Sequence, residues 1–288
     1  MSRTAQIAAS TVFDCREELE ANVAPKVIPG AYQVRLSVGD QSFTQPFRVL
    51  ISTPSTGCVG QTIGRVARMQ SAGGMRLVSN TDPTRVYAET GPDQPLKFWH
   101  GDGELVVLDE WSGGIVFAAP DTLMLEPKQW WDPIYVDPKG LAYRGSLRVG
   151  LDRGGNLQVV NFVSSDDYMR GALPGEMPAH WEFEALRAQA IAARTYAAWR
   201  QSTAGGRTWD VRDDTADQCY GGHTFESPRT SAAVEATAAL ILTFDGKPIR
   251  ALYSSASGGI SENVGCVLDA ERAGGTWQCV PGWPYLQV

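Results

Sequence analysis

Residues 173–196 read LPGEMPAHWEFEALRAQAIAARTY, and this stretch decides how the second half of the chain folds. A proline fixes its own backbone and disfavours helix in the residue before it, so Pro174 and Pro178 predict a turn that holds Glu176. The alanine-rich run that follows predicts a long helix over about 181–199, because alanine is the best helix former. The stretch therefore indicates a glutamate in a stiff turn at the entrance to a long helix.

Two further helices and a hairpin are predicted on either side of this stretch. Ser165 can cap a short helix with Asp166 and Asp167 in its first turn, where carboxylates suit the helix dipole. Ser227-Pro228 predicts the start of another helix, since serine is a good N-cap and proline is tolerated at the first helical position. Asp245-Gly246 predicts a tight turn between two strands.

The region before these helices has the pattern of an antiparallel sheet. Short β-type runs alternate with turn clusters such as Gly-Asp-Gly and Ser-Gly-Gly, and a hairpin is predicted near the N-terminus over 32–51. The fold class is therefore predicted as α+β, an antiparallel β-sheet region plus a helical lobe and a small β-rich N-terminal extension. The predicted strands of the sheet region are 85–88, 104–108, 115–118, 147–151 and 157–163.

Three parts of the chain are expected from these patterns. Residues 1–60 form the β-rich extension, 61–75 form a linker, and 76–288 form the main domain. The linker is assigned because 53–74 is rich in Ser, Thr and Gly, which favour connections over regular structure.

Composition excludes several classes of partner. The 288 residues carry a net charge of -7, which argues against nucleic acid because phosphate binding needs clustered Lys and Arg. No apolar run approaches the roughly 20 residues of a membrane helix, and the first 13 residues lack the apolar core of a signal peptide. The five cysteines are compatible with reduced thiols or with two disulfides and one free thiol.

The residues available for chemistry are mainly carboxylates. The chain has no G-x-S-x-G, H-E-x-x-H, P-loop or dinucleotide-binding motif, and its three histidines are not spaced to share a helix face. Glu176 stands out because a stiff turn with apolar neighbours could hold its carboxyl and raise its pKa, as a general acid requires. On residue types alone, an ordinary exposed turn glutamate is the commoner case.

The whole run 173–196 resembles the signature of the stage II sporulation protein D family, which includes the amidase enhancer proteins. That signature reads Pro-x-Glu-Met-Pro, then Trp, then Glu-Ala-Leu-x-Ala-Gln-Ala-x-Ala-Ala-Arg-Thr-Tyr, and each of these positions is matched here. Gly175 stands where the family usually has Ser. Gln218-x-Tyr220, the segment 253–262 and Pro284-Tyr285-Leu286 resemble later family motifs. The resemblance covers about 143–288 and leaves 1–75 outside, and the family's usual continuation past Pro-Tyr-Leu predicts that a final piece of the domain is missing.

The resemblance implies a lytic transglycosylase that cleaves peptidoglycan glycan strands, preferentially strands without stem peptides. Glu176 matches the family's catalytic glutamate. Hydrolytic glycosidases generally need two carboxyl groups. In a transglycosylase the sugar's own C6 hydroxyl attacks the anomeric carbon, so one carboxyl suffices as acid and then base, and the product carries a 1,6-anhydro end. Asp166 and Asp167 are the nearest candidates for a second carboxylate, although capping is the commoner reason for aspartates at the start of a helix.

The other candidate site residues also come from the resemblance. Gln218 and Tyr220 are expected to line the groove, and the serines are expected either to bond sugar hydroxyls or to form an ordinary turn. Arg194 either orients Glu176 or makes a structural ion pair. The predicted substrate-binding residues are Gln218, Tyr220, Ser254, Ser255, Ser257 and Arg194.

No metal or cofactor is expected. Some family members hold zinc through one His and two Cys, and here Arg212 and Asp217 occupy the cysteine positions, leaving only Cys219 and His223. In an oxidising envelope we expect Cys266 and Cys279 to form a disulfide, and a second pairing of Cys15 with Cys58 would leave Cys219 free.

The expected partners follow from the substrate. They are glycan strands and a cell-wall amidase, with no nucleic acid and no membrane span, and the expected location is the cell envelope or outside the cell. Two other functions stay open. One is a non-catalytic protein that binds peptidoglycan and enhances an amidase, and the other is an adhesive envelope module that works through its N-terminal β segment.

Overall fold

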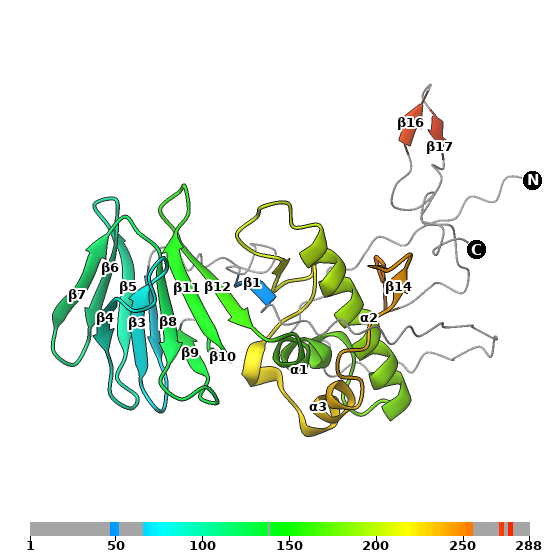
Figure 1. The fold of residues 1–288 in the computed structure, drawn as a ribbon, viewed down its shortest axis with the longest axis horizontal. Coiled ribbons are helices and arrows are strands. Elements are labelled where there is room, and N and C mark those ends of the chain that lie inside the picture. The colour runs from blue at the N-terminus through cyan, green and yellow to red at the C-terminus, as the bar shows by residue number, and fades with distance from the viewer. Residues whose placement is uncertain (1–46, 52–65, 138, 256–270, 274–275, 279–288) are drawn as a thin grey trace, which may run out of the picture.

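The computed structural model describes residues 47–51, 66–137, 139–255, 271–273 and 276–278. The fold is α+β, as predicted, with a β unit at one side and a helical lobe at the other (Figure 1). None of the helices in these ranges is long and apolar enough to cross a membrane.

The β unit consists of two sheets. β1 and β13 run parallel, and the other pairs of described strands in both sheets are antiparallel. The seven-stranded sheet has the order β13 (Val211–Arg212), β1 (Phe47–Ile51), β12 (Leu157–Val163), β11 (Ser146–Leu151), β8 (Leu123–Pro127), β3 (Met75–Ser79) and β4 (Val86–Glu89). The six-stranded sheet has the order β10 (Leu141–Tyr143), β9 (Ile134–Asp137), β2 (Val66–Gln70), β5 (Leu96–Gly101), β6 (Glu104–Asp109) and β7 (Gly114–Ala119).

One hydrophobic core holds the two sheets together. Leu77 and Leu125 of the seven-stranded sheet and Met69 and Phe98 of the six-stranded sheet are fully buried in the same cluster. In β8 the buried residues alternate with partly exposed ones, which is the pattern of a strand with one face toward the core.

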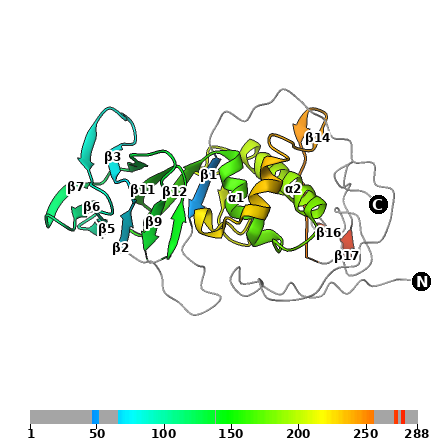
Figure 2. The same ribbon diagram turned by 90° about the horizontal axis from the view of Figure 1, so that it is seen from below.

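The helical lobe follows β12 directly (Figure 1). Its helices α1 (Ser165–Glu176), α2 (Phe183–Ser202) and α3 (Pro228–Glu235) contact one another and lie together beyond the end of the β unit (Figure 2). The lobe also contains the short helix η2 (Gly222–Phe225) and the hairpin β14 (Thr243–Phe244) and β15 (Lys247–Pro248). A separate two-stranded hairpin consists of β16 (Glu271–Ala273) and β17 (Thr276–Gln278).

The five predicted strands of the sheet region correspond to β4, β6, β7, β11 and β12. The predicted linker at 61–75, in contrast, is wrong. Within it, Val66–Gln70 form β2, and the predicted domain boundary falls where β3 begins at Met75. β1 also belongs to the main sheet, although it was assigned to the extension, because it pairs with β12 from Phe47↔Val163 to Ile51↔Val159. The Gly and Ser residues at 71–74 mark a turn between two strands rather than a linker. The rest of 1–60, including the predicted strand at 32–38, lies outside the described residues.

The turn predicted around Glu176 is in fact the last turn of α1. Pro174 lies inside this helix and is buried with its neighbours Ala172 and Leu173, so packing offsets the backbone hydrogen bond that a proline cannot make. The helix ends only at Met177, whose extended backbone (φ -148°) suits the residue before Pro178.

The N-terminus of α1 also differs by one residue from the prediction. Its N-cap is Ser164 rather than Ser165, and the Ser164 hydroxyl accepts a hydrogen bond from the Asp167 backbone N–H at 3.1 Å. The N-cap predicted for α3 is confirmed, since the Ser227 hydroxyl accepts from the Thr230 backbone N–H at 3.3 Å.

Candidate active site

Glu176 ends α1 with a partly buried carboxyl group that is held by two other segments of the chain. Its Oε1 accepts a hydrogen bond from the backbone N–H of Cys219 at 2.7 Å. The hydroxyl of Tyr253, which follows β15, also bonds the carboxyl. Burial raises the pKa of Glu176 from 4.5 to about 7, while the bonds from Cys219 and Tyr253 act in the opposite direction. A carboxyl with this pKa can both give and take a proton near neutral pH.

The approach of Cys219 to Glu176 depends on the small residues of α1. A Cβ atom on Gly175 would lie 2.8 Å from the Cys219 carbonyl oxygen, and one on Gly171 would lie 2.7 Å from the Gly222 carbonyl oxygen. Gly221 donates its backbone N–H to the Gly171 carbonyl at 3.1 Å. The helix and the 219–222 loop are thus in direct backbone contact. Gly175, a departure from the family signature, is what permits that contact here.

A chain of buried hydrogen bonds orients Tyr253. The hydroxyl of Tyr168 donates to Gln218 Oε1 at 2.9 Å, and Gln218 Nε2 donates to the Tyr253 hydroxyl oxygen at 2.8 Å. Because Tyr253 accepts from Gln218, its own hydrogen is free to point at Glu176. Tyr253 is a site residue that sequence reasoning missed. The signal was its place beside Ser254 in a segment that resembles a family motif.

Gln218 and Tyr220 are buried supports rather than groove residues, which corrects the prediction that they contact substrate. Gln218 has no exposed surface, and Tyr220 is 3% exposed. The Tyr220 hydroxyl donates to Asn161 Oδ1 of β12 at 2.8 Å, and its ring centre lies 4.9 Å from that of Tyr168. Both residues therefore fasten the loop that carries Cys219 to the elements around it.

Arg194 is structural as well. Its side chain is 1% exposed and pairs with Asp166 at 3.1 Å. The guanidinium also donates to the carbonyl oxygens of Val234 at 3.2 Å and Thr237 at 2.7 Å, at the end of α3. These contacts settle the two alternatives for Arg194 in favour of an ion pair that joins α2 to α1, with hydrogen bonds that reach the end of α3, and the prediction that it binds substrate is wrong.

The two aspartates at the start of α1 have structural partners. Asp166 pairs with Arg194, and Asp167 accepts a hydrogen bond from the Ser164 hydroxyl at 2.8 Å and pairs with Arg170 at 3.2 Å. Neither is a hydrogen-bond partner of Glu176. Their positions agree with capping and not with a second catalytic carboxylate.

The predicted serines stand next to Tyr253. Ser254 and Ser255 are exposed and directly follow it along the chain. Ser257 lies outside the described residues. Their role in binding sugar hydroxyls stays a prediction.

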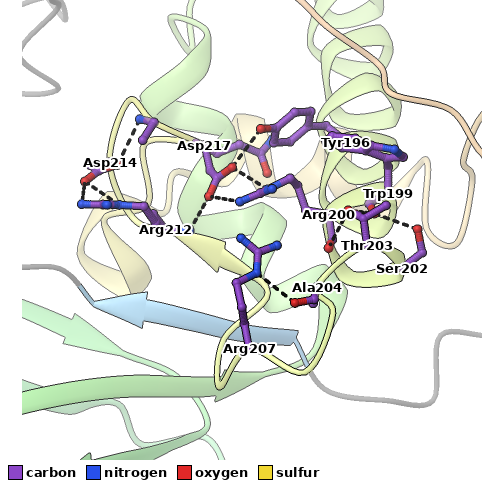
Figure 3. Close-up of polar contacts among 12 residues, drawn as sticks. Tyr196, Trp199, Arg200, Ser202, Thr203, Ala204, Arg207, Arg212, Asp214 and Asp217 are labelled. Carbon is purple, nitrogen blue, oxygen red and sulfur yellow. Dashed lines mark hydrogen bonds and ion pairs between the residues drawn. The ribbon is translucent and has the colours of Figure 1, made fainter. Parts of the chain in front are cut away.

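An ion-pair network occupies the loop where some family members hold zinc (Figure 3). The Asp217 carboxylate pairs with Arg200 at 2.6 Å and accepts hydrogen bonds from the Tyr196 hydroxyl and the Arg212 backbone N–H, both at 2.9 Å. The Arg212 guanidinium turns instead to Asp214 at 2.9 Å. Within the described ranges, no three His, Cys, Asp or Glu side chains gather as a metal site. The network fixes the residue immediately before Gln218.

Cys219 is disulfide-bonded, so the prediction that it is the free thiol is wrong. The other four cysteines, including the predicted pairs, lie outside the described residues. The backbone N–H that binds Glu176 thus belongs to a cross-linked residue.

Comparisons with known proteins find one family model and several relatives that are similar to parts of this chain. Residues 153–244 match the family model described as stage II sporulation protein. The amidase enhancer of Bacillus subtilis is 36% identical over 149 residues, covering 47% of this chain and 20% of that protein. Stage II sporulation protein D of Bacillus amyloliquefaciens is 32% identical over 133 residues, covering 41% of this chain and 38% of that protein. An uncharacterized protein of Brachyspira hyodysenteriae is 34% identical over 152 residues, covering 52% of this chain and 38% of that protein.

The chain spans only 20% to 38% of the lengths of these relatives. The matched region nevertheless contains α1, α2 and the loop with Cys219, which build most of the site around Glu176. Through residues 153–244 the chain is similar to the stage II sporulation protein family, and its relatives include an amidase enhancer and a stage II sporulation protein D.

Proposed function

We propose that this protein is a lytic transglycosylase that cleaves peptidoglycan glycan strands, preferentially those without stem peptides, with Glu176 as general acid and base. The observation that carries the proposal is the partly buried carboxyl of Glu176, whose pKa is raised to about 7. Among the described residues no other carboxylate contributes to that pKa shift. A lone carboxyl suits a reaction in which the nucleophile belongs to the substrate, whereas hydrolysis generally uses two.

The chemistry needs Glu176 in both protonation states. Protonated Glu176 gives its proton to the glycosidic oxygen as the bond from that oxygen to C1 breaks. The C6 hydroxyl oxygen of the same sugar then bonds to C1, and the Glu176 carboxylate takes the hydroxyl proton, which restores the starting acid. The Cys219 N–H and the Tyr253 O–H stabilise the carboxylate between the two transfers. The product ends in a 1,6-anhydro sugar.

The proposed setting is the cell envelope, because peptidoglycan lies outside the cytoplasmic membrane. The proposed partners are glycan strands and a cell-wall amidase. The name of the Bacillus subtilis relative, amidase enhancer, supports the second partner.

The test is mass spectrometry of the products formed by purified protein from peptide-free glycan strands. The wild type should produce 1,6-anhydro ends, and Glu176→Gln should lower the rate by about two to four orders of magnitude. Glu184→Gln is the matched control, since the Glu184 side chain is 77% exposed and pairs only with Arg187 on α2. Products with reducing ends would indicate a hydrolase, and full activity of Glu176→Gln would refute the mechanism.

A non-catalytic function is the second candidate, supported by the same relative's name. In that case the purified protein would bind strands without shortening them and would raise the rate of a cell-wall amidase. Glu176→Gln would then leave the enhancement unchanged.

A further inference from the structure

Three tryptophans that the core does not use lie at one end of the β unit. Trp111, Trp130 and Trp131 are 65%, 80% and 53% exposed. The rings of Trp130 and Trp131 meet edge to face, with centres 5.6 Å apart. Exposed aromatic rings gathered in one place commonly mark an interaction site, because their large apolar faces gain most from being covered.

The strand order places these residues together. The turns and loops at 71–74, 90–95, 110–113 and 128–133 join β2 to β3, β4 to β5, β6 to β7 and β8 to β9, so all four lie at the same end of the antiparallel sheets. Backbone hydrogen bonds link them: Asp93 donates to the Ser71 carbonyl, and Lys128 donates to the Gly74 carbonyl, both at 3.0 Å. Trp111 comes from the third of these loops and the other two tryptophans from the fourth. We call this the aromatic end.

A shallow pocket adjoins Trp111 on the six-stranded sheet. Its volume is about 460 Å³, and its lining residues are Arg68, Pro95, Lys97, Leu108, Glu110 and Trp111. Cross-strand pairing sets Arg68 opposite Lys97 and Lys97 opposite Leu108, so the pocket floor crosses three neighbouring strands.

The charges of the pocket favour an anion. Arg68 pairs with Glu110, which leaves the exposed Lys97 as an ammonium group outside every ion pair formed by the described residues. The charged residues that line the pocket are Arg68, Lys97 and Glu110, which sum to one net positive charge in a chain whose net charge is -7. Asp137 of β9 lies opposite Arg68, outside the lining, so Lys97 is the cation of the pocket that a ligand can reach. A ligand that matches it has a flat apolar face for Trp111 and a carboxylate for Lys97.

We propose that the aromatic end binds a peptide-free glycan strand, with a sugar ring stacked on Trp111 and a sugar-borne carboxylate paired with Lys97. The substrate class rests on the proposed function. Muramic acid carries a lactyl carboxylate that is an amide when the stem peptide is attached and is free when the peptide has been removed. The positive charge of Lys97 thus favours strands without stem peptides, because only these carry the free carboxylate. The neighbouring Trp130 and Trp131 offer further stacking surface to an extended ligand.

The aromatic end is also the end from which the helical lobe leaves the sheets. β8 and β11 are antiparallel, with the middle residue of β8, Leu125, opposite Leu147 near the start of β11, so β11 begins at the end where β8 finishes. Ser146 of β11 pairs with Phe162 at the end of β12. Ser164 then leads from β12 into α1, whose last residue is Glu176.

Binding is measured by tryptophan fluorescence and calorimetry in the Glu176→Gln background, so that no strand is cleaved. The two probes are peptide-free glycan strands and chitin oligosaccharides, which have the same kind of ring without the carboxylate. Trp111→Ala should weaken the binding of both probes by about tenfold. Lys97→Gln should weaken only the binding of the peptide-free strands, by roughly threefold to fivefold.

Two variants serve as controls. Val86→Ala removes another exposed apolar side chain from β4, and Lys247→Gln removes another exposed lysine from β15, so both should leave the two affinities unchanged. Thermal melts of all variants check that each still folds. Unchanged affinities in both Trp111→Ala and Lys97→Gln would refute the proposal, as would an equal loss in Val86→Ala. Because binding is measured without turnover, the two proposals can fail separately. If the wild type cleaves strands but Trp111→Ala binds them with unchanged affinity, this inference is refuted and the proposed catalysis is not. If binding depends on Trp111 but the wild type does not cleave strands, the proposed catalysis is refuted and this inference is not.

Discussion

Replacing Glu176 with Gln should make the folded protein more stable at neutral pH while it removes activity. Glu176→Gln keeps the size of the side chain and an oxygen that can accept from the Cys219 N–H, but it cannot ionise. The wild-type carboxyl is partly buried, and this burial disfavours its charged form. The substitution therefore removes a cost that the wild type bears only when Glu176 is ionised.

The magnitude follows from the pKa of Glu176, which rises from 4.5 to about 7 in the folded protein. Below pH 4.5 both the folded and the unfolded states hold the proton, so Glu176 makes no difference between them. Between pH 4.5 and about 7 the unfolded chain has released a proton that the folded protein still holds, so stability falls as pH rises. The loss levels off above pH 7 at about 3 kcal/mol, since each pKa unit corresponds to about 1.4 kcal/mol.

The assay is urea denaturation of the wild type, Glu176→Gln and the control Glu184→Gln at intervals from pH 4 to 8. The free energy of unfolding of Glu176→Gln minus that of the wild type should rise by about 3 kcal/mol across this range. Other titrating groups affect both proteins equally and cancel in the difference. Glu184→Gln should show a difference that stays flat, because the Glu184 side chain is 77% exposed.

A flat difference for Glu176→Gln from pH 4 to 8 would refute the raised pKa. It would also remove the main physical support for Glu176 as an acid at neutral pH. A difference that fell with pH would mean that the hydrogen bonds from Cys219 and Tyr253 outweigh burial.

Three further substitutions test the supports of the site. Tyr253→Phe removes a hydrogen bond that lowers the pKa of Glu176, so the falling limb of activity should move to higher pH in a pH–rate profile. Gly175→Ala places a Cβ atom 2.8 Å from the Cys219 carbonyl oxygen and should cost about 2 kcal/mol in urea denaturation, with loss of activity. Asp217→Asn removes the charge partner of Arg200 and should cost about 3 kcal/mol by the same measurement, whereas Asp121→Asn on the surface should cost little.

The parts of the fold that were predictable from sequence depend on signals only a few residues apart. The turn at Asp245-Gly246 is one case, since both residues adopt left-handed backbone angles (φ 48° and 73°) that this pair tolerates. The start of α3 at Ser227-Pro228 is another. In both cases the residues that give the sequence signal also form the structure themselves. Asp245 and Gly246 adopt the backbone angles of the turn, and the Ser227 hydroxyl makes the capping hydrogen bond.

The errors arose where distant partners decide the structure. β2 is short, and its partners β5 and β9 lie far along the chain, so its own five residues carry little signal. Pro174 predicted a break, but the burial of α1 against the rest of the lobe keeps the helix intact to Glu176. Local propensity is a weak preference that tertiary packing can override.

The site shows the same division between local and distant information. The position of Glu176 follows from its motif, but its partners Cys219 and Tyr253 come from loops much later in the chain. Gln218 and Arg194 were assigned to substrate because they stand in segments that resemble motifs of the family. In the folded chain both side chains are buried and bond other protein residues, Gln218 to Tyr253 and Arg194 to Asp166. A sequence pattern alone does not distinguish a side chain that binds substrate from one that supports its neighbours.

The buried supports have a chemical consequence because the site depends on one carboxyl. Burial pushes the pKa of Glu176 up, and the bonds from Cys219 and Tyr253 pull it down, so the value near 7 is a balance of opposing effects. Each hydrogen-bond donor is itself held in place, Cys219 by its contact with Gly175 and Tyr253 by Gln218. Residues buried behind the site can therefore shift the pH at which Glu176 gives and takes its proton, and loss of either donor should move that pH upward.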